Sequence, residues 1–383
     1  MESLNSGSQS KISQGDSMTI AISGTNGITL DGQFNSASSM GFKNRIINGA
    51  MVIDQRNAGA SGTATGYNID RWVFGATLTT KGTWQQNAGS VTPPTGFKNY
   101  LGFTSNSAYT PSTSDVFSFY QVIEGFNCAD LMWGTANAQT VTVSFWVRSS
   151  LTGTFGGALS NTTRSNPFSY TISSANTWEQ KTVTVTGDTS GTWNSTNGQG
   201  IFLFLTFGAG STYQGTAGTW VTADYRTVTG AVNTVGTSGA TFYITGVQLE
   251  KGSTATSFDY RPYGTELALC QRYFEKSFDV GTAVAQNSGT YNGTAVASSP
   301  GQLSGMTFGD TRYKVNKRNA ATVTFYNPVA ANAFARDQNG GVNCTATSAW
   351  MAGESAFGIS ASTGAGSGVT NRIAVHWSAD SEL

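Results

Sequence analysis

Short runs in which apolar and polar residues alternate recur along most of the chain. Between residues 141 and 147 every second residue is Val or Phe, and Val183 and Val185 stand between threonines in the same way. Because successive side chains of a strand point to opposite faces, this spacing predicts β-strands that each bury one face. The run 201–207 is apolar at nearly every position, which predicts a central strand covered on both sides.

One glycine interrupts the alternation at a defined point. Phe242 and Ile244 occupy even-numbered positions, whereas Val247 and Leu249 occupy odd-numbered ones. Gly246 lies between the two pairs, where the alternation changes. A β-bulge inserts one extra residue into a strand, re-aims the side chains that follow, and is often marked by glycine. The sequence therefore predicts one strand with a bulge at Gly246.

The composition favours the same fold class. Of 383 residues, 47 are glycine, while aromatic residues make up 12% and charged residues only 11%. Such a chain has few good helix formers but many residues that favour strands and turns. We predict an all-β protein, and the several short strands favour a jelly-roll β-sandwich.

Charge and hydropathy argue against two kinds of partner. The 21 basic residues balance 21 acidic ones without forming a basic run, so no nucleic-acid partner is expected. The longest good apolar run, Ile201–Leu205, is far below the roughly 18 residues of a membrane span, so no membrane insertion is expected. Residues 1–4 show no feature of a secretory signal. These properties together fit a virion component that is assembled in the cytoplasm and released by lysis.

We predict three segments, with limits at residues 1–40, 41–264 and 265–383. In the first, alternation followed by Asn26-Gly27 predicts a β-hairpin, which is too small to be stable alone. We therefore expect it to order only when further copies or a partner complete its core. The second segment is the predicted jelly roll, and the third is a C-terminal β-sandwich rich in loops.

Catalytic residues are scarce in this sequence. His376 is the only histidine, and alternation places it on the exposed face of a strand, opposite Ile373, Val375 and Trp377. No Gly-x-Ser-x-Gly nucleophile elbow occurs, so hydrolysis by a Ser-His-Asp triad is not expected. A glycosidase needs two carboxylates, but nothing in the spacing of the 21 acidic residues marks a pair. We expect a protein that is not an enzyme.

Metal and cofactor sites are not expected either. Cys128, Cys270 and Cys344 are odd in number and far apart, which fits buried apolar residues better than a disulfide framework. One histidine cannot supply a His-based zinc site, and no Asp-rich run marks a calcium site.

Several segments, in this order, resemble a group of bacteriophage tail-fibre and virion proteins that carry a jelly roll like that of carbohydrate-binding modules. The strongest is Gly246-Val247-Gln248-Leu249-Glu250, which leads through Phe258 into the run from Arg261-Pro262-Tyr263-Gly264 to Tyr273. The others are Gly41–Gly49 with Ile53–Asn57, Asp70-Arg71-Trp72, Gln121–Gly125, Ser144–Ser149, Gly187–Trp193, Thr216–Trp220 and the ending Ala379–Leu383.

The resemblance implies a homotrimeric fibre. Its N-terminal segment would attach to the phage tail or to an adaptor protein, the jelly roll would form the body, and the last domain would be the distal tip. The location implied is the virion, and the function implied is attachment to the host cell. The resemblance does not tell which residues contact a receptor.

Carbohydrate binding is the chemistry that the loops favour. Aromatic rings stack on the flat faces of sugars, and amide, carboxylate or guanidinium groups bind their polar edges. On this basis the candidate glycan-binding residues are Trp193, Asn194, Tyr213, Trp220, Tyr225 and Trp350. The structural alternative is that Trp193 and Trp220 fold back to close the end of the sandwich.

The sequence therefore predicts a phage tail fibre for host attachment that binds a surface glycan or protein. Two alternatives stay open. One is a polysaccharide depolymerase, and the other is a purely structural capsid or tail fibre without a ligand.

Overall fold

The computed structural model describes residues 11–14, 18–23, 27–30, 42–299, 306–362 and 371–383. The chain divides into two compact units, Met1–Lys43 and Asn44–Leu383. Among the described residues of the second unit, the two largest apolar cores are built from residues 46–249 and from residues 313–379. Strands dominate the described residues of both units, which confirms the all-β prediction. The finer division at residues 264 and 265 stays a prediction.

The N-terminal unit contains a small antiparallel sheet. Its strands are β1 (Lys11–Gln14), β2 (Met18–Ser23) and β3 (Gly27–Leu30), in the order β1-β2-β3. Ser23 pairs with Gly27 and Ile22 with Ile28. The predicted hairpin is therefore confirmed, and a third strand, β1, extends it.

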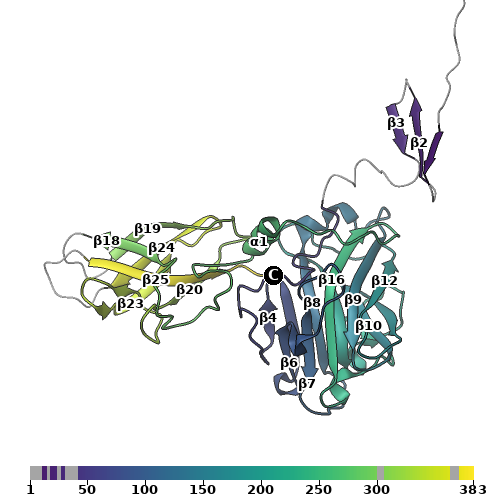
Figure 1. Cartoon of the computed structure of the whole chain (residues 1–383), viewed down its shortest axis with the longest axis horizontal. Helices are drawn as coiled ribbons and strands as arrows, with labels where there is room; N and C mark the ends of the chain where they lie inside the picture. The colour runs from purple at the N-terminus through teal and green to yellow at the C-terminus, as the bar shows by residue number, and fades with distance from the viewer. Residues whose placement is uncertain (1–10, 15–17, 24–26, 31–41, 300–305, 363–370) are drawn as a thin grey trace, which may run out of the picture. The chain divides into compact units, whose positions relative to one another are not determined.

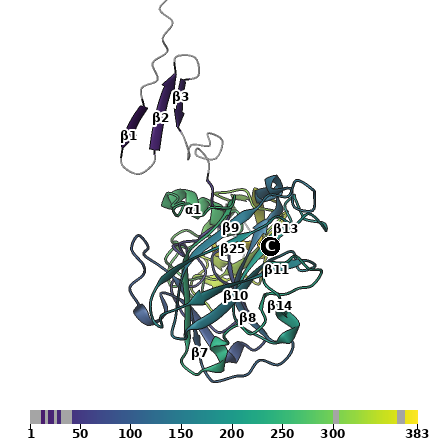
Figure 2. The ribbon, with the colours of Figure 1, turned by 90° about the vertical axis from the view of Figure 1, so that its right-hand side faces the viewer.

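Two sheets form the larger sandwich of the second unit (Figure 1, Figure 2). The first sheet has the order β11-β10-β13-β8-β5-β4, and the second has the order β12-β9-β16-β7-β6. The strands of the first sheet are β4 (Gly66–Ile69), β5 (Trp72–Ala76), β8 (Val116–Glu124), β10 (Gly153–Ser160), β11 (Ser165–Ile172) and β13 (Gln199–Ala209). Those of the second are β6 (Gly82–Gln86), β7 (Leu101–Ser105), β9 (Val141–Ser149), β12 (Glu179–Val185) and β16 (Thr241–Lys251).

The sandwich core is built from the inward residues of both sheets. Phe207 of β13 contacts the rings of Phe103 and Phe242 from the opposite sheet, with centroids 4.3 Å and 5.3 Å away. On the outer face of the same strand, Phe202 and Phe204 are also buried. The prediction of a central strand covered on both sides is thus confirmed for residues 201–207.

The predicted bulge is present in β16. The register against β9 shifts between Thr245 and Gln248, and Gly246 has a φ of 59°. The bulge aims the Val247 amide at the Gly49 carbonyl, 2.9 Å away. Val247 and Leu249 then point into the core, as Phe242 and Ile244 do before the bulge.

The C-terminal strands gather around the long strand β25 (Asn371–Asp380), drawn in yellow in Figure 1. One sheet combines it with β17 (Phe274–Lys276), β18 (Ala295–Ser299), β20 (Thr322–Tyr326), β21 (Arg336–Asp337) and β22 (Val342–Asn343). A second sheet has the order β19-β24-β23, with β19 (Met306–Arg312), β24 (Ala356–Ser362) and β23 (Ala346–Trp350). The predicted C-terminal sandwich corresponds to these two sheets.

Short elements connect the strands. In the described residues the only α-helix is α1 (Tyr263–Gln271), and no helix is long and apolar enough to cross a membrane. A short parallel pair joins β14 (Gln214–Gly215) to β15 (Thr227–Val228). The 3-10 turns are η1 (Thr79–Lys81), η2 (Ala88–Ser90), η3 (Gly125–Asn127), η4 (Ala129–Leu131), η5 (Ser211–Tyr213) and η6 (Thr234–Gly236).

The prediction for His376 was wrong, whereas that for the cysteines is confirmed. His376 is fully buried, because Phe278 covers the face of β25 that the alternation left polar. The imidazole stacks on the Phe278 ring at 3.9 Å and hydrogen-bonds to Ser277 Oγ and the Thr290 carbonyl. Cys128, Cys270 and Cys344 are buried and free.

Candidate functional site

Four chain segments meet at one end of the larger sandwich. They are the connection from β8 to β9, the turn between β10 and β11, the loop 186–198 between β12 and β13, and the segment 216–224. Backbone bonds fasten them together, for example from Gly134 to the Asp188 carbonyl at 2.7 Å and from Ser165 to the Val221 carbonyl at 3.0 Å. The loop 186–198 therefore lies in the middle of this assembly.

Three tryptophans pack against one another beneath these loops. The ring centroids of Trp133, Trp193 and Trp220 lie 4.8–5.4 Å apart in edge-to-face contacts. Each indole N–H also has a partner within the protein: the Gln139 carbonyl for Trp133, Asp188 for Trp193 and the Thr186 carbonyl for Trp220. Such packing closes the end of the core, as the structural alternative for Trp193 and Trp220 predicts.

A buried ion pair fixes the start of the central loop. Arg164 donates from Nε and Nη2 to the two carboxylate oxygens of Asp188, at 2.5 Å and 2.8 Å. These hydrogen bonds raise the pKa of Arg164 above its ordinary value. Because Asp188 also accepts from the Ser190 amide and the Trp193 indole, one carboxylate orders both the loop and the tryptophan.

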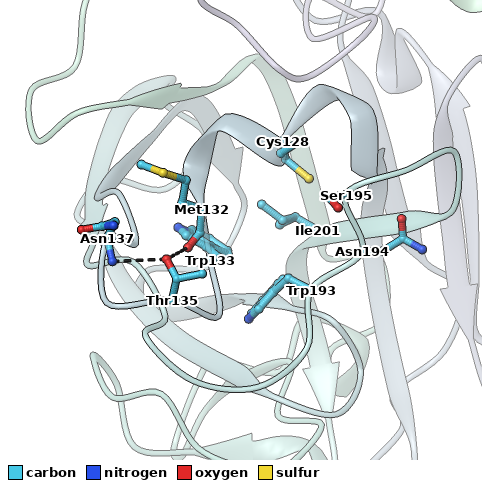
Figure 3. Close-up of a pocket in the computed structure, with 10 residues that line it drawn as sticks. Cys128, Met132, Trp133, Thr135, Asn137, Trp193, Asn194, Ser195 and Ile201 are labelled. Atoms are coloured by element: carbon cyan, nitrogen blue, oxygen red, sulfur yellow. Dashed lines mark hydrogen bonds between the residues drawn. The ribbon is translucent and has the colours of Figure 1, made fainter.

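A pocket of about 460 Å³ opens between the β8–β9 connection and the loop 186–198 (Figure 3). Its volume lies in the usual range for small-molecule sites. Met132, Trp133, Thr135 and Asn137 lie on one side, and the segment 193–195 lies on the other. Cys128, Ala129 and Ile201 complete the lining.

The lining of this pocket is uncharged and combines apolar with polar side chains. Its polar side chains are those of Thr135, Asn137, Asn194 and Ser195, besides the thiol and the two indoles. Burial raises the pKa of the Cys128 thiol to about 12, so this thiol is neutral at pH 7 and is a poor nucleophile. The arrangement can hold a neutral polar ligand against an aromatic ring.

A second hollow of about 440 Å³ borders the same loop. Its lining residues are Asn161, Thr163, Arg164, Gly191, Thr192 and Thr222. Arg164 is its one charged residue, and its charge is already balanced by Asp188. Asp130, next to the first pocket, is likewise paired with Arg45 at 2.8 Å. Both hollows are therefore close to electrically neutral.

The structure brings three of the six predicted residues together. Trp193 and Asn194 line the first pocket, and Trp220 packs directly behind Trp193. Tyr213 and Tyr225 lie elsewhere: Arg226 stacks on the Tyr213 ring at 4.6 Å, and the Tyr225 ring lies against Gly215.

Trp350 belongs to the C-terminal strands and lines neither hollow. It is half exposed on β23 and pairs with Gly358 of β24. Because directly opposed residues of an antiparallel pair share a face, no larger side chain stands opposite its indole.

The hollows are also lined by Met132, Trp133, Asn137 and Arg164, which are not among the residues predicted from the sequence. Trp133 is buried, yet it also lines the pocket. The signal that could have found this wall is Met132-Trp133-Gly134, two large apolar residues in a polar connection. Met132 has a φ of 53°, an unusual backbone conformation that recurs at functional sites, and its side chain is 41% exposed.

Comparison with known proteins adds little to this geometry. No family model and no curated protein sequence matches the chain. Among solved structures, a putative sugar-binding protein from Bacteroides thetaiotaomicron is 10% identical, with a TM-score of 0.32 over 55% of this chain and 100% of that one. The carbohydrate-binding module TmCBM61 in complex with β-1,4-galactotriose is also 10% identical, with a TM-score of 0.29 over 55% of this chain and 99% of that one.

Another similar solved structure comes from a bacteriophage. The enzymatically active domain of tailspike protein 4 from bacteriophage CBA120 is 13% identical, with a TM-score of 0.30 over 55% of this chain. The match spans only 21% of the tailspike domain. Similarity at this level assigns no function, so function has to be inferred from the residues of the site.

Proposed function

We propose that this protein is a phage tail fibre that attaches the virion to its host by binding a surface glycan without cleaving it. The observation that carries the proposal is the uncharged pocket beside Trp193. It combines an aromatic side chain with amide and hydroxyl groups in the manner that sugars require.

The chemistry of the pocket suits a sugar ring. Trp193 is half-buried, so part of its indole can pack against C–H groups. Asn137 and Thr135 from one wall and Asn194 and Ser195 from the other can then reach the hydroxyl groups at the ring edge. Each such neutral hydrogen bond contributes about 1 kcal/mol, which gives a weak single site.

Hydrolysis is not favoured at this end of the sandwich. A glycosidase needs two carboxyl groups about 5–10 Å apart, facing one sugar. Among the described residues that line the two hollows there is no Asp or Glu. A depolymerase would therefore have to use another part of the molecule, and we retain binding as the proposed function.

Trimerisation would compensate for a weak site. Three identical pockets on one fibre raise the apparent affinity through effective concentration, without any new contact. In this proposal residues 1–40 join three chains and attach them to the tail or to an adaptor protein. The small N-terminal unit that carries the sheet β1-β2-β3 supports this role, because a unit of this size usually needs oligomerisation to be stable.

Glycan binding can be tested with two pocket variants. Trp193→Ala removes the aromatic wall, and Asn137→Ala removes a polar group whose side chain stands at the pocket rim. We expect the first to weaken binding at least tenfold and the second by about fivefold, corresponding to roughly 1 kcal/mol. The measurement is binding to an array of host surface glycans, followed by calorimetry.

The matched control is Trp350→Ala, which removes an exposed indole far from the pocket in the sequence. Binding lost in the Trp350 variant and kept in the Trp193 variant would place the site on the C-terminal strands. Glycans shortened on incubation with the unaltered protein would favour the depolymerase. A protein that binds no host glycan would favour the purely structural fibre.

A further inference from the structure

The two walls of the pocket are each anchored to the C-terminal part of the chain by one arginine. Glu124 is the last residue of β8 and precedes the β8–β9 connection, which forms one wall. Its carboxylate accepts hydrogen bonds from Arg272 at 2.6 Å and 2.9 Å and from the Tyr273 hydroxyl at 2.6 Å. In the other wall, the Asn197 carbonyl accepts from Arg318 Nη1 at 2.8 Å. These contacts cross 148 and 121 residues of sequence.

The walls are also bonded directly to each other. The Gly125 amide donates to the Gly198 carbonyl at 2.9 Å, and the Phe126 amide donates to the Thr196 carbonyl at 2.7 Å. A Cβ at Gly125 would lie 2.5–2.6 Å from atoms of Asn194 and Thr196. Because real Cβ contacts are essentially never this short, the two walls leave no room for a side chain between them at this point.

Arg318 holds more than the pocket loop. Its Nε donates to the Ser381 carbonyl at 2.9 Å and its Nη2 to the Glu382 carbonyl at 2.7 Å, while its amide donates to the Arg272 carbonyl at 3.1 Å. Glu382 in turn pairs with Arg56, 3.0 Å away, and with Arg71. The guanidinium of Arg318 therefore joins the pocket loop to residues 381–382, and its backbone amide adds a bond to Arg272.

We infer that Arg318 is a positioning residue that couples the shape of the glycan pocket to the docking of residues 381–382. When Arg318 is in place, its fork of donors holds the loop 194–198 and residues 381–382 in one fixed arrangement. When residues 381–382 leave, two of its three side-chain acceptors are lost and the loop is released. The inference rests on the proposed function for its ligand, but the coupling exists with or without a glycan.

Coupling of this kind works in both directions. If docking of residues 381–382 favours the binding shape of the pocket, then a ligand in the pocket must stabilise that docking by the same factor. Binding of a host glycan at the sandwich would thereby be transmitted to the C-terminal strands. A lysine at position 318 cannot substitute, because one ammonium group cannot span carbonyls on separate segments as the planar fork does.

Hydrogen exchange on the full-length protein tests the coupling without a ligand. In Arg318→Ala we expect the amides of Gly125 and Phe126 to exchange about tenfold faster, because the charge-assisted bond to the Asn197 carbonyl no longer holds the loop that carries their acceptors, Gly198 and Thr196. In Arg318→Lys the same two amides should also exchange faster. This variant keeps the positive charge but lacks the planar guanidinium, so the result shows which of the two is required. Arg372→Ala, a change of equal charge at an exposed residue, should leave both amides unchanged.

The reciprocal measurement uses the glycan that binds most strongly in the array. In the unaltered protein it should slow exchange of the Ser381 amide, which donates to the Tyr273 carbonyl at 2.8 Å, and in Arg318→Ala it should not. If Gly125 and Phe126 exchange at the same rate in Arg318→Ala as in the unaltered protein, the coupling is refuted. If no glycan binds, the proposed function fails while the ligand-free experiment still decides this inference.

Discussion

At the scale of single residues, His376 shows how tertiary contacts change the chemistry of a side chain. Its imidazole lies between β25 and Phe278, where it bonds Ser277 and Thr290 rather than water. Burial lowers the pKa of His376 below its ordinary value, although the bond to the Thr290 carbonyl opposes this. The folded protein thus favours the neutral ring.

This shift predicts that the C-terminal strands lose stability in acid. A histidine whose folded pKa is depressed contributes stability above its unfolded pKa of about 6.5, and that contribution is lost as the pH falls through the folded pKa. Thermal unfolding from pH 8 to pH 5 should show a falling melting temperature. In His376→Gln this part of the pH dependence should disappear, and an unchanged profile would show that other groups cause it.

At the scale of elements, β16 depends on the backbone of one glycine. The bulge requires the left-handed conformation of Gly246, and a Cβ there would lie 2.6 Å from Cζ of Phe97. The bulge follows from the sequence position where the alternation changes, whereas the contact with Phe97 depends on the tertiary structure. The strand can bury Ile244 and Val247 in the same core only because the bulge inserts one residue between them.

Gly246→Ala should therefore destabilise the larger sandwich by about 2–3 kcal/mol, through strain and steric overlap together. Gly239→Ala is the matched control, because Gly239 also has a positive φ but its Cβ would meet no atom within 4 Å. That control should cost only about 1 kcal/mol. Denaturant unfolding gives the free energy of unfolding of each variant. If both variants lose the same free energy, the overlap with Phe97 does not contribute to the loss.

At the scale of the whole molecule, oligomeric state decides whether the fibre proposal holds. One chain has a mass of 40.2 kDa. We expect light scattering to give three times this mass for the full-length protein and the mass of one chain for a protein that begins at Asn44. If the full-length and the shortened protein are both trimers, the contacts between chains lie in residues 44–383. If both are monomers, the fibre proposal is contradicted.

Much of the fold could be predicted from local patterns. Alternation around β9, the apolar run of β13, the parity change at Gly246 and the hairpin of residues 18–30 all have structural counterparts. Each of these signals is contained within about a dozen consecutive residues. Strand geometry imposes a period of two on any chain that buries one face, so the sequence must carry that period.

The candidate site could be predicted only in part. Trp193 and Asn194 were predicted because an aromatic ring next to an amide suits a sugar, but Tyr213, Tyr225 and Trp350 lie in other places. The second wall, with Asn137, comes from a connection more than fifty residues earlier. Only the folding of both sheets brings these loops to one end of the sandwich.

The sequence by itself determined that this chain forms β-sheets, where several of its strands lie and that its surface relies on neutral polar groups. The tertiary structure decided that His376 is buried, that Arg164 is neutralised by Asp188, and that Arg318 reaches the pocket loop. The reason is physical: strand pattern reflects contacts between near neighbours in the chain. Burial, ion pairing and pocket shape depend instead on contacts between residues separated by tens to hundreds of positions.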